Sequence, residues 1–366
     1  MPVNVIHVVG ARPNFVKIAP IFREIAEREG AFQQVLVHTG QHYDPEMSEV
    51  FFDEFGLPEP HFNLGVGSAS HARQTAKVML ELEALLEEQN PDWLVVVGDV
   101  NSTLAAALVA SKMGIRTAHV EAGLRSFDRT MPEEINRLLT DQIADLLLTP
   151  SRDADENLAR EGVPADRIAF VGNVMIDTLV RLAPRVDRRW PDVRKAMELD
   201  DDYMLVTLHR PRNVDHSDTL AEILGALWQL GRRMPVVFPI HPRTLRRIEE
   251  FGLNIPDGAD LRFIEPLGYI DFMGLTAHAS LVLTDSGGVQ EETTFLGIPC
   301  LTARPNTERP ITIGEGTNRL VDSSMDAIVE AADEVLEGTR TFEPGRPELW
   351  DGEAAKRVVD ELETRG

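Results

Sequence analysis

The chain has little cysteine, few cations and no long apolar run. Cys300 is the single cysteine among 366 residues, which excludes an internal disulfide and any cysteine-rich metal site. No apolar run approaches the ~18 residues that a membrane helix needs. The opening segment MPVNVIHVVG lacks the basic region of a signal peptide. We therefore expect a cytoplasmic protein with no membrane partner.

Positive charge is scarce as well. Lys and Arg number 36 against 60 Asp and Glu, which gives a formal net charge of −24. This balance argues against nucleic acid and against anionic membranes as partners. An anionic ligand would therefore need a local cluster of cations to overcome the field of the whole chain.

Several well-known motifs are missing too. There is no HExxH and no pair of cysteines, so we expect no metal. The first turn reads GARPNF instead of GxGxxG, which argues against a nicotinamide. GxxxxGK[ST] and GxSxG are absent, which argues against ATP hydrolysis and against a serine hydrolase. The missing motifs therefore lead us to expect no cofactor.

The pattern that is present alternates short β-branched runs with longer helical segments. The helical example is STLAAALVASKMG, residues 102–114, closed by Gly114. Near-continuous apolar strands between helices predict parallel sheets covered on both faces. The predicted strands are 3–10, 34–40, 92–99, 116–123, 145–151 and 167–172, then 203–209, 235–241, 261–266, 280–285 and 299–302.

This pattern predicts an α/β protein of two Rossmann-like, doubly wound domains with an active-site cleft between them. The polar, proline-containing stretch at 185–202 separates the two series of strands. We expect an N-terminal domain at 1–172, a linker or hinge at 173–202 and a C-terminal domain at 203–350. A last helix at 351–366 is free to cap either domain, and we place it on the first.

Charged residues follow the predicted strands, at the sheet edge where α/β proteins bind ligands. Singly, each has an ordinary alternative: Asp99 as a helix N-cap, Lys17 as a solvated charge. Together they indicate a site. The residues are Arg12, Lys17, Asp99, His119, Glu121, Arg125, His209, Arg210, His241, Arg243 and Arg309.

Two predicted helix N-termini also have both a functional and an ordinary structural interpretation. LTDSGGVQEE, residues 283–292, ends a strand and opens a helix with two glycines, which suits a phosphate on the helix N-terminus. The alternative is a plain capped turn. In MPEEINR, residues 131–137, Pro132 and the acids after it are favoured by helix electrostatics alone. The further hypothesis is that Glu133 approaches Glu121.

Taken together, these motifs resemble the non-hydrolysing UDP-N-acetylglucosamine 2-epimerases. The resemblance runs through GARPNFVK, HTGQH, GDVNST, VEAGLRS, MPEEINR, GNVMIDT, HRPRNVD, IHP, DSGGVQEE, TERP and GTNRLV, in the family's order. It implies the glycosyltransferase-B architecture, no metal or nicotinamide, a homodimer and a place in cell-surface polysaccharide biosynthesis. It also implies a catalytic group of Asp99, Glu121, Glu133 and His209. The substrate-binding residues that it implies are Arg12, Lys17, Arg137, Arg210, His241, Phe272, Ser286, Gly287, Gly288, Glu292 and Arg309.

The family's reaction explains why several acids are needed. As the resemblance implies, UDP is eliminated across C1–C2 to give 2-acetamidoglucal and is then added back, with the proton delivered to the opposite face of C2. Our hypothesis is that Asp99, Glu121 and Glu133 share the proton transfers, while His209 and Arg210 steady the leaving diphosphate. Glu292 would accept the ribose hydroxyls.

Alternatives remain at this level. Two segments also resemble the sister enzymes that epimerise UDP-2,3-diacetamido-glucuronate, namely HTGQHYDPEMSEVFF and SFDRTMPEEINR. The TERP segment instead favours UDP-GlcNAc as the substrate. A UDP-sugar glycosyltransferase would share the architecture, and a nucleotide-sugar sensor would not need the acids. Gln41 is present, but Asp44 replaces the glutamine through which many bacterial members bind a second UDP-GlcNAc. Substrate activation is therefore not expected.

Overall fold

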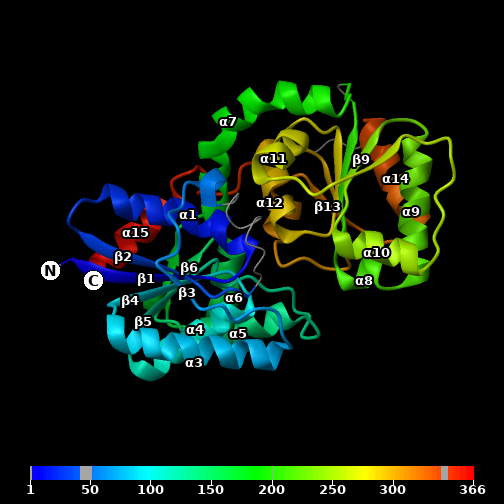
Figure 1. Ribbon diagram of the computed structural model, residues 1–366. Helices are drawn as coiled ribbons and strands as arrows, with labels where there is room; N and C mark the ends of the chain where they lie inside the picture. The colour runs from blue at the N-terminus through cyan, green and yellow to red at the C-terminus, as the bar shows by residue number, and fades with distance from the viewer. Residues whose placement is uncertain (1, 42–51, 201, 339–344) are drawn as a thin grey trace. The chain divides into compact units, whose positions relative to one another are not determined.

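A computed structural model describes residues 2–41, 52–200, 202–338 and 345–366, without the side chain of Arg12. The chain divides into two compact units (Figure 1). The first unit is Met1–Arg181 with Glu348–Gly366, and the second is Leu182–Pro347. Both are α/β.

The first unit holds a seven-stranded parallel sheet in the order β3-β2-β1-β4-β5-β6-β7. Its strands are β1 (Val3–Val9), β2 (Phe32–His38), β3 (Phe62–Asn63), β4 (Trp93–Val97), β5 (Arg116–Val120), β6 (Leu146–Thr149) and β7 (Ile168–Phe170). Its helices are α1 (Arg12–Glu27), α3 (His71–Gln89), α4 (Asn101–Met113), α5 (Pro132–Ile143), α6 (Arg152–Arg160) and α15 (Ala354–Thr364).

The second unit holds a six-stranded parallel sheet in the order β10-β9-β8-β11-β12-β13. Its strands are β8 (Met204–Thr207), β9 (Val236–Pro239), β10 (Leu261–Ile264), β11 (Leu281–Thr284), β12 (Cys300–Ala303) and β13 (Asn318–Val321). Its helices are α8 (Pro211–Val214), α9 (Ser217–Gly231), α10 (Pro242–Glu250), α11 (Tyr269–Ala277), α12 (Gly287–Leu296), α13 (Ile311–Gly314) and α14 (Met325–Leu336).

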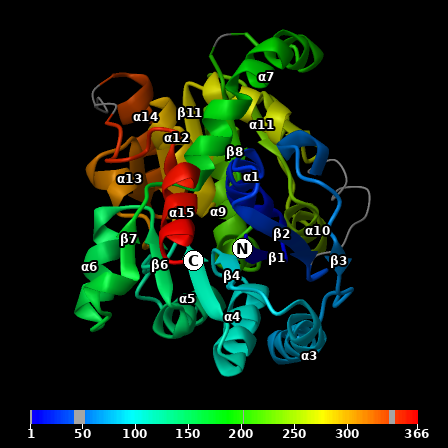
Figure 2. The ribbon, with the colours of Figure 1, turned by 90° about the vertical axis from the view of Figure 1, so that its left-hand side faces the viewer.

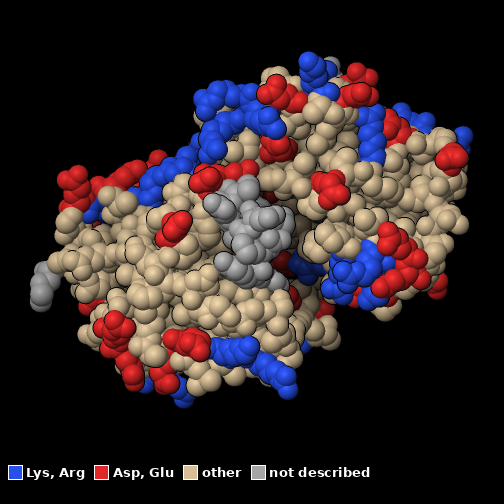
Figure 3. Space-filling model, viewed as in Figure 1, with Lys and Arg blue, Asp and Glu red and all other residues tan. Residues whose placement is uncertain are grey.

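Helix α7 (Val174–Ala196) occupies most of the segment for which a linker was expected, and the division between the units falls inside it. Lys and Arg gather over this helix (Figure 3) in an otherwise acidic chain. The C-terminal helix α15 belongs to the first unit, where it packs against α1 (Figures 1 and 2).

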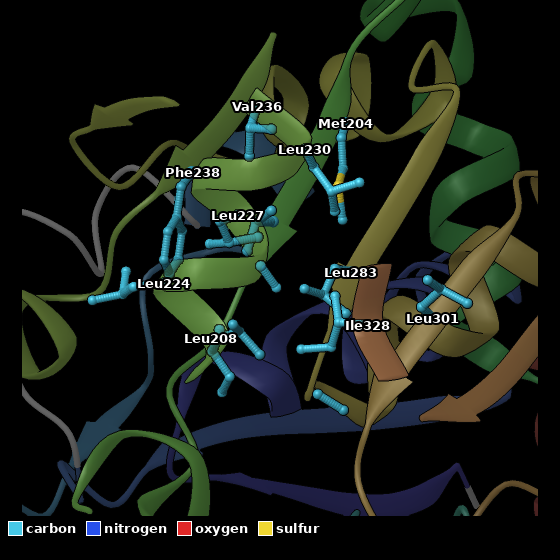
Figure 4. Packing of buried hydrophobic residues seen from close by; sticks show 14 of the residues in the cluster. Met204, Leu208, Leu224, Leu227, Leu230, Val236, Phe238, Leu283, Leu301 and Ile328 are labelled. Carbon is cyan, nitrogen blue, oxygen red and sulfur yellow. The ribbon is translucent and has the colours of Figure 1, made fainter. Parts of the chain in front are cut away.

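Apolar strands supply the cores. All five residues of β4, WLVVV, are buried, as expected for a strand covered on both faces. In the second unit, side chains from β8, α9, β9, β11 and α14 interdigitate in one cluster (Figure 4). Met204, Leu227, Val236, Leu283 and Ile328 are members of this cluster. Helix α4 ends at Gly114, whose φ of 74° is left-handed and suits glycine.

Two strands of the structure, β3 and β13, were not predicted from the sequence. β3 is two residues long, too short for an alternation to be seen, and β13 reads NRLV, with two polar residues in four. Both are edge strands, where burial on two faces is not required. Several predicted strands also end earlier, because residues such as Asp99 and Glu121 lie in the loops that follow β4 and β5.

The strand orders place the switch points of the two sheets. In the first sheet the chain moves outward from β1 in one direction and from β4 in the other; in the second the pair is β8 and β11. Loops that leave the carboxyl ends of such neighbouring strands diverge and leave room for a ligand. Among the described residues, no helix is long and apolar enough to cross a membrane.

Candidate functional site

A buried ion pair lies at the switch point of the first sheet. Lys17 of α1 binds the carboxylate of Glu121, which follows β5, and both side chains are buried. Glu121 has a φ of 70°, which is uncommon for a residue with a side chain. A Cβ on Gly98, whose φ is also positive, would lie 3.2 Å from Lys17 Nζ. The loop after β4 therefore runs directly against this pair.

Asp99 is held beside it by α5. Its carboxylate pairs with Arg137, and its carbonyl accepts a hydrogen bond from Asn136 Nδ2 at 2.8 Å. Arg137 also donates to Glu134 Oε2 at 2.5 Å. Burial opposes ionisation of Glu134, but N–H groups of Ser126 and Arg137 outweigh it, so the pKa of Glu134 is lowered. Arg137 is thus fixed between two carboxylates.

The acids of MPEEINR behave differently from one another. Glu134, which the sequence pattern did not single out, is buried, and its carboxylate accepts the amides of Ser126 and Phe127 at 3.0 and 2.9 Å. Glu133 is exposed on the first turn of α5 and makes no hydrogen bond or ion pair with any described residue. Its approach to Glu121 stays a prediction.

His119 and Arg125 belong to the support of the site. Asp141 of α5 accepts from His119 Nδ1 at 2.6 Å and pairs with Arg125 Nη1 at 2.7 Å. The other ring nitrogen of His119 lies 2.8 Å from the carbonyl of Gly98. These buried contacts fix the Gly98–Asp99 loop and leave both side chains without exposure to a ligand.

The second unit has its own cluster around Asp285, the residue after β11. Asp285 accepts the backbone amides of His209 and Arg210 at 3.0 and 2.8 Å, and His209 Nδ1 lies 3.2 Å from Oδ1. Burial opposes ionisation of Asp285, but His209 and the Arg210 amide outweigh it and lower its pKa. The His209 ring is about half exposed and lies 6.0 Å from the ring of His241. Asp285 therefore presents His209 at the sheet edge.

The SGG turn begins α12. Ser286 is the N-cap, and its side chain makes no capping hydrogen bond with a described residue. A Cβ on Gly287 would overlap Arg309 Nη1 and lie 2.7 Å from Glu308 Oε1, so a side chain does not fit there. Gly288 is partly exposed. The first amides of α12 are those that a phosphate would use.

Arg309 is packed against this turn by two buried carboxylates, Glu291 at 2.8 Å and Glu308 at 2.5 Å. Glu308 also pairs with the buried Arg304 at 2.6 Å. Arg304 and Glu308 were not among the predicted site residues. The clue in the sequence was the i,i+4 spacing of Arg304 and Glu308 in RPNTERP, directly after a predicted strand.

Glu292 is buried on the second turn of α12. The hydroxyl of Tyr269 donates to Glu292 Oε1 at 3.1 Å. Burial raises the pKa of Glu292 to about 8, against the effect of Tyr269. Phe272, on the same helix as Tyr269, is partly buried and packs on the apolar cluster under α11. His241 is exposed, and its Nδ1 accepts from the amide of Arg243 at 3.1 Å.

Two residues named in the sequence analysis cannot be placed in the structure. Asp44 and the side chain of Arg12 lie outside the described residues. Gln41 is described, and its Oε1 accepts from Ser102 N at 3.1 Å and Ser102 Oγ at 2.8 Å, so it fixes the start of α4. Within the described part of the chain, no group of three metal-ligating side chains occurs.

Comparison with known proteins gives a consistent result. A family model described as UDP-N-acetylglucosamine 2-epimerase matches residues 23–363. A UDP-N-acetylglucosamine 2-epimerase of Methanocaldococcus jannaschii is 42% identical over 360 residues, covering 96% of each chain. A UDP-2,3-diacetamido-2,3-dideoxy-D-glucuronate 2-epimerase of Pseudomonas aeruginosa is 40% identical over 362 residues, covering 98% of this chain and 99% of its own.

Solved structures agree. The M. jannaschii enzyme in complex with UDP-GlcNAc and UDP superposes with a TM-score of 0.91 at 40% identity, covering 99% of this chain and 100% of that one. The UDP-GlcNAc 2-epimerase of Neisseria meningitidis bound to UDP-GlcNAc gives 0.90 at 29% identity, covering 98% and 99%. The similarity therefore spans both units and the two sheet edges.

Proposed function

Because the chain belongs to the UDP-N-acetylglucosamine 2-epimerase family, we propose that it interconverts UDP-GlcNAc and UDP-ManNAc without hydrolysis. The observation that carries this proposal is the pair of carboxylates at one sheet edge, Glu121 and Asp99, each held by a cation. A binding protein would need neither. Two acids at fixed positions are what a reaction that removes and returns a proton requires.

The proposed reaction has two balanced steps. In the first, the C2–H proton passes to a base, the bond between C1 and the diphosphate oxygen breaks, and 2-acetamidoglucal and UDP form. In the second, UDP adds back to C1 and a proton reaches the opposite face of C2. We assign the proton transfers to Asp99, Glu121 and Glu133. Lys17 pairs with Glu121 and Arg137 pairs with Asp99, so both carboxylates are held in fixed positions.

The second unit would hold the nucleotide of the same substrate. The amides of Gly287 and Gly288 open α12 and suit the diphosphate. We assign Ser286, Arg210, His241 and Arg309 to the binding of the same diphosphate. His209, set by Asp285, would stabilise the leaving diphosphate. Glu292 would accept the ribose hydroxyls once it ionises, and Phe272 would flank the uracil. Arg12 completes the proposed binding set.

Phosphorus and proton NMR of UDP-GlcNAc incubated with the purified chain, without metal or nicotinamide, tests the proposal. The expected product is UDP-ManNAc, in a mixture that reaches the same composition from either sugar. Free UDP together with ManNAc would instead identify a hydrolysing enzyme. An acceptor-dependent release of UDP would identify a glycosyltransferase.

One alternative substrate has direct support. The P. aeruginosa relative, 40% identical, is a UDP-2,3-diacetamido-glucuronate 2-epimerase, and the exposed Arg129 in SFDRT is a cation that a sugar carboxylate could use. Parallel assays of both nucleotide sugars at equal concentration decide between them. The principal proposal requires the higher kcat/KM for UDP-GlcNAc.

We further propose that the protein acts in the cytoplasm as a homodimer that supplies an activated sugar for cell-surface polysaccharides. The support for a dimer is a set of exposed apolar side chains on the helices of the first unit. Helix α4 carries a single charged residue, Lys112, and packs between α3 and α5. Leu80 and Leu139 on those neighbouring helices are 68% and 48% exposed. Apolar faces of this kind mark interaction surfaces.

A further inference from the structure

A single carboxylate joins three arginines in the second unit. Glu308 is 3% exposed; its Oε2 accepts from Arg304 Nη2 at 2.6 Å, and its Oε1 pairs with Arg309 Nη1 at 2.5 Å. Arg210 Nη2 lies 3.7 Å from the same Oε1. Residues from the loops after β8 and β12 therefore meet at one buried anion.

The charge of Glu308 persists at neutral pH. Burial opposes its ionisation, but the charges of Arg309 and Arg304 outweigh it and hold the pKa of Glu308 well below its ordinary value. An ionised carboxylate between guanidinium groups fixes their planes, since the paired hydrogen bonds are directional. The three side chains are thus oriented before any ligand arrives.

This cluster touches the turn proposed to hold the diphosphate. β12 pairs with β11, so the loop that begins at Arg304 neighbours the loop that holds Ser286. A Cβ built on Gly287 would lie 2.7 Å from Glu308 Oε1 and overlap Arg309 Nη1. Glu308 and Arg309 are therefore packed directly against the start of α12.

Arg304 adds a second observation. Its side chain is 5% exposed, and its Nη1 has no hydrogen-bond acceptor among the residues that the structure describes. A buried, charged N–H group without an acceptor is costly. Its position beside Glu308 makes sense if an anionic ligand supplies the acceptor.

We propose that Glu308 is a positioning residue that fixes Arg304 and Arg309 as paired donors to the phosphates of the nucleotide sugar, and that Arg304 itself binds phosphate. This inference rests on the proposed function, because the diphosphate is its ligand. It extends the proposed binding residues beyond Arg309 to Arg304, which directly follows β12.

The proposal makes a prediction opposite to that of simple charge counting. Glu308 repels a diphosphate through space, so its loss would tighten UDP binding if only net charge mattered. If Glu308 acts by positioning, Glu308→Gln frees the guanidinium groups of Arg304 and Arg309, and UDP binds more weakly. Tighter UDP binding by Glu308→Gln would therefore indicate charge repulsion, and weaker UDP binding would indicate positioning.

The experiment compares UDP and uridine as probes of the full chain, by calorimetry for UDP and ligand-observed NMR for uridine. We expect Glu308→Gln and Arg304→Met to weaken UDP binding by about tenfold or more, the loss of one charge-assisted hydrogen bond. Uridine, which has no phosphate, should change by less than about twofold. The control is Arg319→Met, which removes a neighbouring-strand arginine paired with Glu334.

Each outcome decides the matter. Unchanged or tighter UDP binding by Glu308→Gln, or unchanged binding by Arg304→Met, would overturn the proposal; in the latter case ordered water satisfies Nη1. Equal losses for UDP and uridine would mean a structural role only. If Arg304→Met does not fold, Arg304→Lys, which keeps the charge without the planar fork, replaces it and should still lose UDP affinity. A wild-type chain that binds no UDP would instead overturn the proposed function itself.

Discussion

At the scale of single residues, the site depends on carboxylates whose environments differ. Glu121 is buried against Lys17, Asp99 is partly exposed against Arg137, and Glu292 is buried against Tyr269. The sequence pattern placed Glu121 and Asp99 at a sheet edge, because each lies at the end of a predicted strand, whereas Glu292 was implied by the family resemblance. It did not separate buried from exposed members of adjacent acidic pairs, since burial depends on the angle of packing and not on local sequence. Glu134 shows this, as the buried neighbour of the exposed Glu133.

Replacing the proposed acids should abolish turnover while leaving the nucleotide site intact. Asp99→Asn and Glu121→Gln remove a proton-transfer group, so we expect kcat to fall by about 10²–10⁴-fold. UDP affinity should stay within about threefold of wild type, because nucleotide contacts are proposed for the other unit. Initial rates and calorimetry measure the two effects. Glu83→Gln, on an exposed turn of α3, is the control; activity retained in both test variants would remove these acids from the mechanism.

Glu292 should make stability depend on pH. Its folded pKa of about 8 lies above the ordinary 4.5, so between these values the folded state keeps a proton that the unfolded chain releases. Glu292 therefore does not reduce the free energy of unfolding below about pH 4.5. As pH rises from about 4.5 toward 8, the free energy of unfolding falls. Glu292→Gln should raise the thermal unfolding midpoint relative to wild type at pH 8.5 and have little effect at pH 4.5. The exposed Glu249→Gln is the control. An equal effect at both pH values would contradict the buried, protonated state.

At the scale of elements, the fold follows from strands that are mostly apolar and from helices that begin in polar turns. The strands β4 and β11 could be read from sequence because burial on both faces makes them almost continuously apolar, WLVVV and LVLT. The edge strands β3 and β13 could not, because an edge tolerates polar residues. The start of α12 could also be predicted, because Asp285 and Ser286 followed by two glycines are typical of a turn that opens a helix. What remained hidden was the packing of Arg309 on Gly287, a contact between loops that are distant in sequence.

The SGG turn offers a direct test of that packing. Gly287→Ala introduces a Cβ that overlaps Arg309 Nη1, so the arginine must move away from the turn. We expect UDP affinity to fall by at least about tenfold with the chain still folded. Gly314→Ala is the matched control, because a Cβ there meets no atom within 4 Å. Calorimetry with UDP measures both. Equal affinities would show that the turn tolerates a side chain and that Arg309 is not needed where it lies.

At the scale of the whole molecule, a net charge of −24 limits how two copies can associate. Like-charged surfaces repel, so contact is favoured where charge is lowest. A hollow lined by residues of α3, α4 and α5 fits this condition, because its lining contains no Lys, Arg, Asp or Glu and is mostly apolar, including Ala76, Met79, Pro132 and Ile135. The sequence pattern alone did not identify this face, because α4 reads equally well as a helix buried inside one chain.

We expect a dimer in solution that dissociates when this face is charged. Leu80→Glu combined with Leu139→Glu places two carboxylates on an already acidic surface, so the mass in sedimentation equilibrium should fall from two chains to one. Leu245→Glu, at another exposed leucine in the second unit, is the control and should leave the mass unchanged. A monomeric wild type, or a double variant that remains dimeric, would contradict this assignment.

The proposed reaction breaks and remakes the C2–H bond of UDP-GlcNAc. The most direct measurement is proton NMR of UDP-GlcNAc with the enzyme in D₂O. We expect UDP-ManNAc carrying deuterium at C2, followed by loss of the C2 proton signal from the UDP-GlcNAc pool. UDP-ManNAc that keeps its C2 proton, or a nucleotide sugar unchanged after long incubation, would contradict it.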